Sequence, residues 1–174
     1  MVIFKDNKYY TKYAYKTETE FETDVVDNAS VFFGEKTIYI DAKKKITSKT
    51  LGNSIPDGFL FDLKDIENPE FYIVEAELIS HDFYSHIFPQ ITKFFAFYKN
   101  YETRRELVEK LYSIINSESS LEKQFKDIIG VNELYKYLSD VIENSQNILL
   151  VIDGEKKELP EIIHRPAGYP LPAE

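Results

Sequence analysis

Residues 55–63 read Ile-Pro-Asp-Gly-Phe-Leu-Phe-Asp-Leu, and residues 71–78 read Phe-Tyr-Ile-Val-Glu-Ala-Glu-Leu. Both stretches are rich in aromatic and branched side chains, which predicts two short β-strands. Because side chains alternate between the two faces of a strand, Glu75 and Glu77 share one face of the second strand with Ile73. Two carboxylates therefore lie on a face that is otherwise predicted to be buried.

A buried carboxylate is costly unless it is paired or binds a metal ion. Asp57 lies at the start of the first strand, and pairing of the two strands would place it about 5 Å from one of the two glutamates. Carboxylate oxygens that converge on one point are the ligands that Mg²⁺ and Mn²⁺ prefer. The sequence therefore predicts a site for Mg²⁺ or Mn²⁺ formed by Asp57, Glu75 and Glu77.

Pro56-Asp57, followed after seventeen residues by Glu75-Ala76-Glu77, resembles the signature of the PD-(D/E)xK nuclease superfamily. This superfamily includes restriction enzymes, repair nucleases and junction resolvases. The resemblance implies that Asp57 and Glu75 hold Mg²⁺ and that the chain hydrolyses phosphodiester bonds in nucleic acid, with DNA as the expected partner. Glu77 stands where the family usually has its lysine. Some restriction enzymes of the superfamily carry Glu-x-Glu, and others move the lysine elsewhere.

In many members of the superfamily, the first helix supplies a further glutamate to the metal site. Thr17 and Glu20 have the spacing of a capping box, which predicts that a helix begins here. By resemblance, Glu20 is the expected glutamate, with Glu18 and Glu22 as alternatives. Acidic residues also favour the first turn of any helix, so the pattern has an ordinary structural explanation as well.

A subset of the superfamily carries Gln-x-x-x-Tyr on its second helix. The segment Gln90-Ile-Thr-Lys-Phe94 is similar, with phenylalanine in place of tyrosine. The resemblance implies that Gln90 lines the site. Lys93 lies one helical turn from Gln90, so both can face the same groove, and Lys93 is our candidate for the displaced lysine. A lysine that simply faces solvent is an equally good interpretation.

Four basic residues outside the carboxylate site are candidates for contacts with nucleic-acid phosphates: Lys43, Lys44, Lys45 and His86. A run of lysines is more often solvated surface, and His81 and His86 are spaced poorly for two ligands on one helical face. The formal net charge of −9 also opposes the nuclease interpretation, because nucleic-acid-binding proteins usually show a basic surface.

Composition sets the remaining bounds. A chain of 174 residues with 43% hydrophobic residues is long and apolar enough for one folded domain with a real core. The absence of cysteine excludes disulfides and thiolate metal sites. No signal-peptide pattern is apparent, and no stretch approaches the roughly eighteen apolar residues of a membrane span. We therefore expect a cytoplasmic protein that does not enter a membrane.

The periodicities predict a single α/β (α+β) domain over residues 1–174. By resemblance, it has a restriction-endonuclease-like core, a central mixed β-sheet flanked by helices in the order α-β-β-β-α-(helical insertion)-β. The core covers about 17–100 and 147–154, the helical insertion about 101–145, and an irregular proline-rich tail 159–174. The chain is expected to begin with an extended lead at 1–16 and a helix from Thr17 to Gly34, with Phe21, Val25 and Phe32 on one face. A strand at 37–46, a polar turn at 47–54 and the two strands described above follow. The remaining expected elements are a helix from 83 to about 100, two amphipathic helices at 101–116 and 120–143, and a last strand at 147–154.

Two other functional classes stay open. Glu77 in place of the lysine is the feature expected of a catalytically inactive nuclease-fold domain that binds nucleic acid or a protein partner. The net charge of −9 is the feature expected of an acidic interaction protein. If the chain cuts both strands of a duplex, a homodimer is an arrangement that would bring two such sites together.

Overall fold

A mixed four-stranded β-sheet forms the centre of the computed structural model, which describes residues 2–46, 55–130 and 133–159. The sheet has the strand order β3-β4-β5-β6. Its strands are β3 (Thr37–Asp41), β4 (Gly58–Asp62), β5 (Glu70–Glu77) and β6 (Asn147–Ile152). Neighbours among β3, β4 and β5 are antiparallel, and β6 runs parallel to β5. The predicted α/β class and mixed sheet are thus confirmed.

The two aromatic stretches pair with each other, as the sequence predicts. Gly58 lies opposite Val74, and Phe61 lies opposite Phe71. The Phe61 and Phe71 rings are 5.0 Å apart between centroids, and the Phe59 and Phe71 rings are 5.8 Å apart. All three rings are fully buried, so this pairing lies at the centre of the core.

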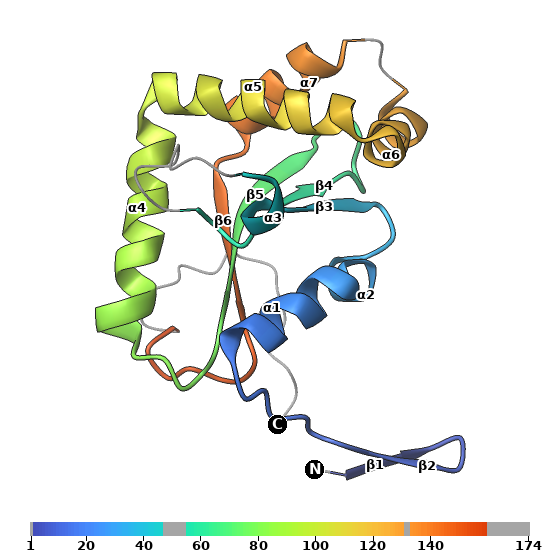
Figure 1. The fold of residues 1–174 in the computed structure, drawn as a ribbon, viewed down its shortest axis with the longest axis vertical. Coiled ribbons are helices and arrows are strands. Elements are labelled where there is room, and N and C mark those ends of the chain that lie inside the picture. Colours follow the sequence, from blue (N-terminus) through green and yellow to red (C-terminus); the bar gives the residue numbers. More distant parts are fainter. Residues whose placement is uncertain (1, 47–54, 131–132, 160–174) are drawn as a thin grey trace.

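Helices cover both faces of the sheet (Figure 1). Phe71 and Ile73 belong to the larger apolar cluster, together with residues of α4 (Phe88–Lys99), α5 (Tyr101–Ser117), α6 (Ser119–Ile129) and α7 (Leu134–Asn144). Ala76 and Leu78, on the opposite face of β5, pack against Phe21 of α1 (Glu18–Asp27). The α5–α7 helices gather at one end of the sheet (Figure 1), and Glu75 and Glu77 lie among the last three residues of β5.

The first predicted helix begins where the capping pattern places it, because Thr17 Oγ1 accepts a hydrogen bond from the Glu20 N–H at 3.2 Å. It is broken at Asn28 into α1 and a short α2 (Ala29–Phe33), and α2 ends at Gly34 as predicted. The prediction that Phe32 shares the buried face was wrong. Its side chain is 47% exposed, because the break changes the helical phase after Asn28.

The predicted extended lead is partly a hairpin of β1 (Val2–Lys5) and β2 (Lys8–Thr11). Asp6 and Asn7 form its two-residue turn with positive φ angles of 50° and 60°, as a tight hairpin requires. Figure 1 shows the hairpin projecting away from the central sheet. The side chains of Phe4 and Tyr9, which face each other across it, are exposed.

The strand predicted at 37–46 is shorter than expected. β3 ends at Asp41, whose Oδ1 accepts a hydrogen bond from the Lys44 N–H at 3.0 Å and caps a one-turn helix, α3 (Ala42–Lys45). The three consecutive lysines are therefore helical and point in different directions. This change places Lys43 toward the carboxylates, as described below.

The remaining helices differ from the prediction in detail. The helix expected from residue 83 to about 100 is a π-helical turn, η1 (Phe83–Ile87), that continues into α4, with Pro89 in the first turn of α4. The single helix expected at 120–143 is two helices, α6 and α7, because Gly130 takes a left-handed φ of 60° and ends α6.

Two sequence predictions, the polar turn at 47–54 and the proline-rich tail from residue 160 onward, fall outside the described residues. Among the helices that the structure describes, none combines the length and the apolar character needed to cross a membrane.

One side chain links α7 to the middle of the sheet and provides a test of the fold. Ser145 Oγ accepts a hydrogen bond from the buried Phe71 N–H at 2.7 Å. Ser145→Ala leaves that donor without its partner and should lower the free energy of unfolding by about 1–3 kcal/mol. Ser117→Ala, at the exposed end of α5, should change it by less than about 0.5 kcal/mol. Urea titrations of both variants make the comparison, and equal effects would contradict the role of Ser145.

Candidate functional site

The candidate site lies where β4 and β5 part. Their pairing ends at Gly58 and Val74, next to Asp57. The Asp57 N–H still donates to the Val74 carbonyl at 3.1 Å, but the next donor of β5, the Ala76 N–H, donates to Asp57 Oδ2 at 2.6 Å. The Asp57 side chain thus accepts the hydrogen bond that the backbone of a neighbouring strand would otherwise accept. Beyond this point β5 pairs with β6 alone among the described strands.

The three predicted carboxylates are all buried at this place. Asp57 is 4% exposed, Glu75 3% and Glu77 0%. Burial, together with the negative charges of Asp57 and Glu77, raises the pKa of Glu75 to about 9, although the nearby Lys43 lowers it. Burial also raises the pKa of Asp57 to about 6, against the Ala76 hydrogen bond and Lys43, which both lower it. Without a further cation, Glu75 is therefore held in its neutral, protonated form near neutral pH.

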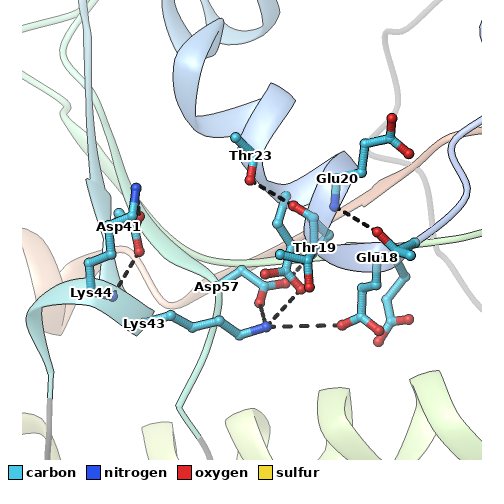
Figure 2. Close-up of polar contacts among 12 residues, drawn as sticks. Glu18, Thr19, Glu20, Thr23, Asp41, Lys43, Lys44 and Asp57 are labelled. Atoms are coloured by element: carbon cyan, nitrogen blue, oxygen red, sulfur yellow. Dashed lines mark hydrogen bonds and ion pairs between the residues drawn. The ribbon is translucent and has the colours of Figure 1, made fainter.

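Lys43, in α3, is the cation that lies closest to the centre of the site. Its Nζ forms an ion pair with Asp57 Oδ1, lies 2.8 Å from Glu22 Oε1 and 4.0 Å from Glu18 Oε1 (Figure 2). Burial alone would lower the pKa of Lys43, but its hydrogen bonds to Asp57 and Glu22 outweigh burial and raise it. The ammonium group is therefore held in its charged form.

Helix α1 supplies Glu18 and Glu22, which lie one turn apart on the same face. Glu20, the expected glutamate, does not join them. Its carboxylate accepts hydrogen bonds from the Lys16 N–H at 2.9 Å and from the Tyr13 hydroxyl, and Figure 2 shows it pointing away from Lys43. Glu20 thus completes the helix cap, while the two alternatives named from the sequence reach the site.

Glu18, Glu22 and Asp57 form the first group that could hold a cation. Each offers one carboxylate oxygen, and these oxygens all lie within 4.8 Å of one another. They line a cavity of about 430 Å³, to which Tyr39 and Lys43 also contribute. A cavity of about 620 Å³ lies elsewhere, between the 66–70 turn and the end of α7, and contains none of these groups. The chemistry therefore points to the smaller cavity.

Gly58 is required for the strands to approach each other at this point. A Cβ atom at Gly58 would lie 2.1 Å from the Tyr39 hydroxyl oxygen, which is a steric clash. Tyr39 stacks on Phe33 of α2 with ring centroids 5.8 Å apart, so it has little freedom to move aside. Glycine after Asp57 thus keeps β3 in contact with the site.

The other predicted residues are more scattered. Gln90 follows His86 by one helical turn, and its Oε1 is buried without a hydrogen-bond partner in the described chain. Lys93 is exposed on α4, and no ion pair or hydrogen bond reaches it from the residues the structure describes. Lys44 pairs with Asp41 at 3.3 Å, and Lys45 pairs with Glu118. The three lysines of α3 thus form no common patch.

His81 and His86, whose spacing argued against a joint role as ligands, lie together at the end of β5. His81 Nδ1 lies 2.6 Å from Glu77 Oε2, and His86 Nε2 lies 3.3 Å from Glu77 Oε1. The spacing of five residues is poor for one α-helical face, but His81 lies outside the helix, in the turn before η1. The signal in the sequence was a pair of histidines closely following Glu-x-Glu, and only the fold brings them together.

In comparisons with known proteins, no family model, curated protein or solved structure matches the chain. Membership of the PD-(D/E)xK superfamily therefore stays a prediction from the sequence. What the site can do rests on the geometry of its own residues.

The raised pKa of Glu75 predicts how the metal-free protein responds to pH. An unfolded glutamate titrates near 4.5, and folded Glu75 near 9, so the folded state binds the extra proton between these values. The free energy of unfolding should then fall as pH rises through this window, by up to about 1.4 kcal/mol per pH unit. Glu75→Gln should remove most of this fall and melt higher than wild type at pH 8 in EDTA.

Thermal melts between pH 5 and pH 9 in EDTA test this prediction. Glu106→Gln is the matched control, because Glu106 is exposed on α5. It should keep the wild-type pH dependence. A Glu75→Gln protein that shows the same slope as wild type would mean that Glu75 is charged and well solvated in the folded state.

Proposed function

We propose that the chain is a metal-dependent nuclease that hydrolyses phosphodiester bonds in nucleic acid, with DNA as the expected substrate. One observation carries the proposal. Two buried carboxylates, Asp57 and Glu75, lie where two strands part, with the ammonium group of Lys43 held against Asp57. Clustered carboxylates with one cation at a cavity are the groups that metal-assisted phosphodiester hydrolysis needs.

The order of the elements supports the same proposal. α1, β3, β4, β5, α4 and β6 follow one another in the order expected of a restriction-endonuclease-like core, and α5–α7 occupy the expected place of the helical insertion. The antiparallel β3-β4-β5 set with parallel β6 also suits a mixed central sheet. This agreement strengthens the resemblance that Pro56-Asp57 and Glu75-Ala76-Glu77 suggest.

The residues fit Mg²⁺ or Mn²⁺. Asp57, Glu75, Glu18 and Glu22 offer only oxygen ligands, which these hard cations prefer. Glu75 Oε2 is buried and has no hydrogen-bond partner among the described residues, so one oxygen is available for a ligand. When bound, such an ion lowers the pKa of a water molecule and stabilises charge on the phosphate.

Lys43 takes the part that the sequence assigned to Lys93. Its Nζ lies in contact with Asp57 and Glu22, whereas Lys93 is exposed on α4. Held there, the ammonium group would offset negative charge on a phosphate bound at the carboxylates. Lys44, which also lines the cavity, would contact a neighbouring phosphate of the chain. These two lysines place positive charge at the site in a chain whose net charge is −9.

Glu77, at the usual position of the lysine, has a different environment. It is fully buried and lies against His81 and His86. A glutamate at this position cannot supply the positive charge that the family's lysine would bring to the phosphate. In this proposal that charge therefore comes from Lys43 of α3.

A cleavage assay tests the proposed function. Wild-type protein with Mg²⁺ or Mn²⁺ should cut supercoiled DNA, single-stranded DNA or RNA, and EDTA should stop the reaction. Asp57→Ala and Glu75→Ala should each abolish cleavage while keeping the wild-type circular dichroism spectrum. Either variant cutting at the wild-type rate would remove these carboxylates from the site. Binding without cleavage would favour an inactive nuclease-fold domain, and no binding at all would favour an acidic interaction protein.

The two candidate lysines give a sharper prediction within the same assay. Lys43→Ala should lower the rate of cleavage by about 10²-fold or more, as removal of one electrostatic stabiliser does in other enzymes. Lys93→Ala should change it by less than about 2-fold, because the side chain is exposed and away from the carboxylate contacts. The opposite order of the two effects would return the catalytic role to Lys93.

A further inference from the structure

We infer a second metal site, formed by Glu18, Glu77, His81 and His86, that takes a divalent transition metal of the Zn²⁺ class. It does not rest on the proposed nuclease function, because its argument concerns only the affinity of these four side chains for a metal. The resemblance carried by Asp57 and Glu75 does not imply this second site.

Four separate parts of the fold bring the four side chains together. Glu77 is the last residue of β5, His81 lies in the turn that follows, and His86 lies in η1. Asp82 caps η1 by accepting the Ser85 N–H at 2.7 Å, which fixes the turn between the two histidines. As a result the His81 and His86 rings lie 4.7 Å apart between centroids. The fourth side chain, Glu18, comes from α1.

The ligand atoms lie close enough for one ion. His81 Nδ1 is 2.6 Å from Glu77 Oε2 and 3.7 Å from Glu18 Oε2, and His86 Nε2 is 3.3 Å from Glu77 Oε1. All four residues have a ligand atom within 4.8 Å of the others. An ion with bonds of about 2.1 Å to nitrogen and oxygen holds its ligand atoms roughly 3–4 Å apart, so small rotations of the side chains suffice.

A second observation independent of the cluster itself points to a ligand. Glu77 is 0% exposed, yet its Oε1 has no hydrogen-bond partner of good geometry among the described residues. That oxygen points into the cluster, toward the ring nitrogen of His86. A buried carboxylate oxygen without a hydrogen bond is costly, and a bound cation removes that cost.

The donor set selects the metal. Neutral imidazole nitrogen suits Zn²⁺, Co²⁺, Ni²⁺ and Fe²⁺, whereas Mg²⁺ prefers oxygen ligands and keeps several waters. Two imidazoles and two carboxylates therefore discriminate against Mg²⁺. The group of Glu18, Glu22 and Asp57 contains no nitrogen ligand and has the opposite preference. Glu18 faces both groups, with Oε2 toward His81 and Oε1 toward Lys43, so the two sites are neighbours that share one carboxylate.

Isothermal titration with Zn²⁺ in the presence of millimolar Mg²⁺ tests the site. Wild-type protein should bind Zn²⁺ despite the excess of Mg²⁺. Loss of a residue behind a ligand typically costs about 10–100-fold in metal affinity, so loss of a ligand in His81→Ala or His86→Ala should weaken Zn²⁺ binding by at least about 100-fold. Glu106→Gln is the control, because Glu106 is exposed on α5 and belongs to neither group of ligands. It should leave Zn²⁺ affinity within about 3-fold of wild type.

If a histidine variant fails to fold, a measurement on the wild-type protein still tests the inference. X-ray absorption at the zinc edge of Zn²⁺-loaded wild type should show scattering from two imidazole rings. The inference is overturned if the bound Zn²⁺ has only oxygen neighbours, if wild type binds no Zn²⁺ in Mg²⁺, or if folded His81→Ala binds it as tightly as wild type. None of these readouts uses nucleic acid, so failure of the nuclease proposal would be seen separately, in the cleavage assay.

Discussion

The hydrogen bond from the Ala76 N–H to Asp57 Oδ2 is the interaction on which the rest of the site depends. It ends the pairing of β4 with β5 by putting a carboxylate where a strand would continue. Glu75 and Glu77 are thereby left on a strand that is buried by helices but no longer paired on that side. A buried carboxylate needs a cation or several hydrogen-bond donors, so the surrounding elements have to supply positive charge.

The structure places one cation at Asp57 and two imidazole rings at Glu77. The cap of α3 by Asp41 turns the chain so that Lys43 contacts Asp57, and the turn after β5 brings His81 and His86 to Glu77. Each is a local turn, capped by an aspartate side chain, that directs polar side chains inward. Glu18 and Glu22 of α1 add negative charge to the same place, which the protein cations only partly offset. This excess of carboxylate is the physical reason for expecting bound metal.

The sequence predicted the strands and the burial of their carboxylates well, because both depend on local patterns. Alternation and aromatic content placed β4 and β5, and the apolar run at 147–152 placed β6. The sequence predicted the directions of individual side chains less well. Glu20, the expected glutamate, accepts the Lys16 N–H in the helix cap. The segment 37–46 was expected to be one strand, but its last residues form the helical turn that carries Lys43. The histidine cluster depends on a π-helical turn, which has no reliable signal in a single sequence.

In our proposal, Asp57 and Glu75 bind a divalent metal ion together. Anomalous scattering from a crystal soaked in Mn²⁺ locates such an ion. We expect a peak between the Asp57 and Glu75 carboxylates that disappears in crystals of Asp57→Asn. An absence of any peak there at millimolar Mn²⁺, or a peak that persists unchanged in Asp57→Asn, would contradict it.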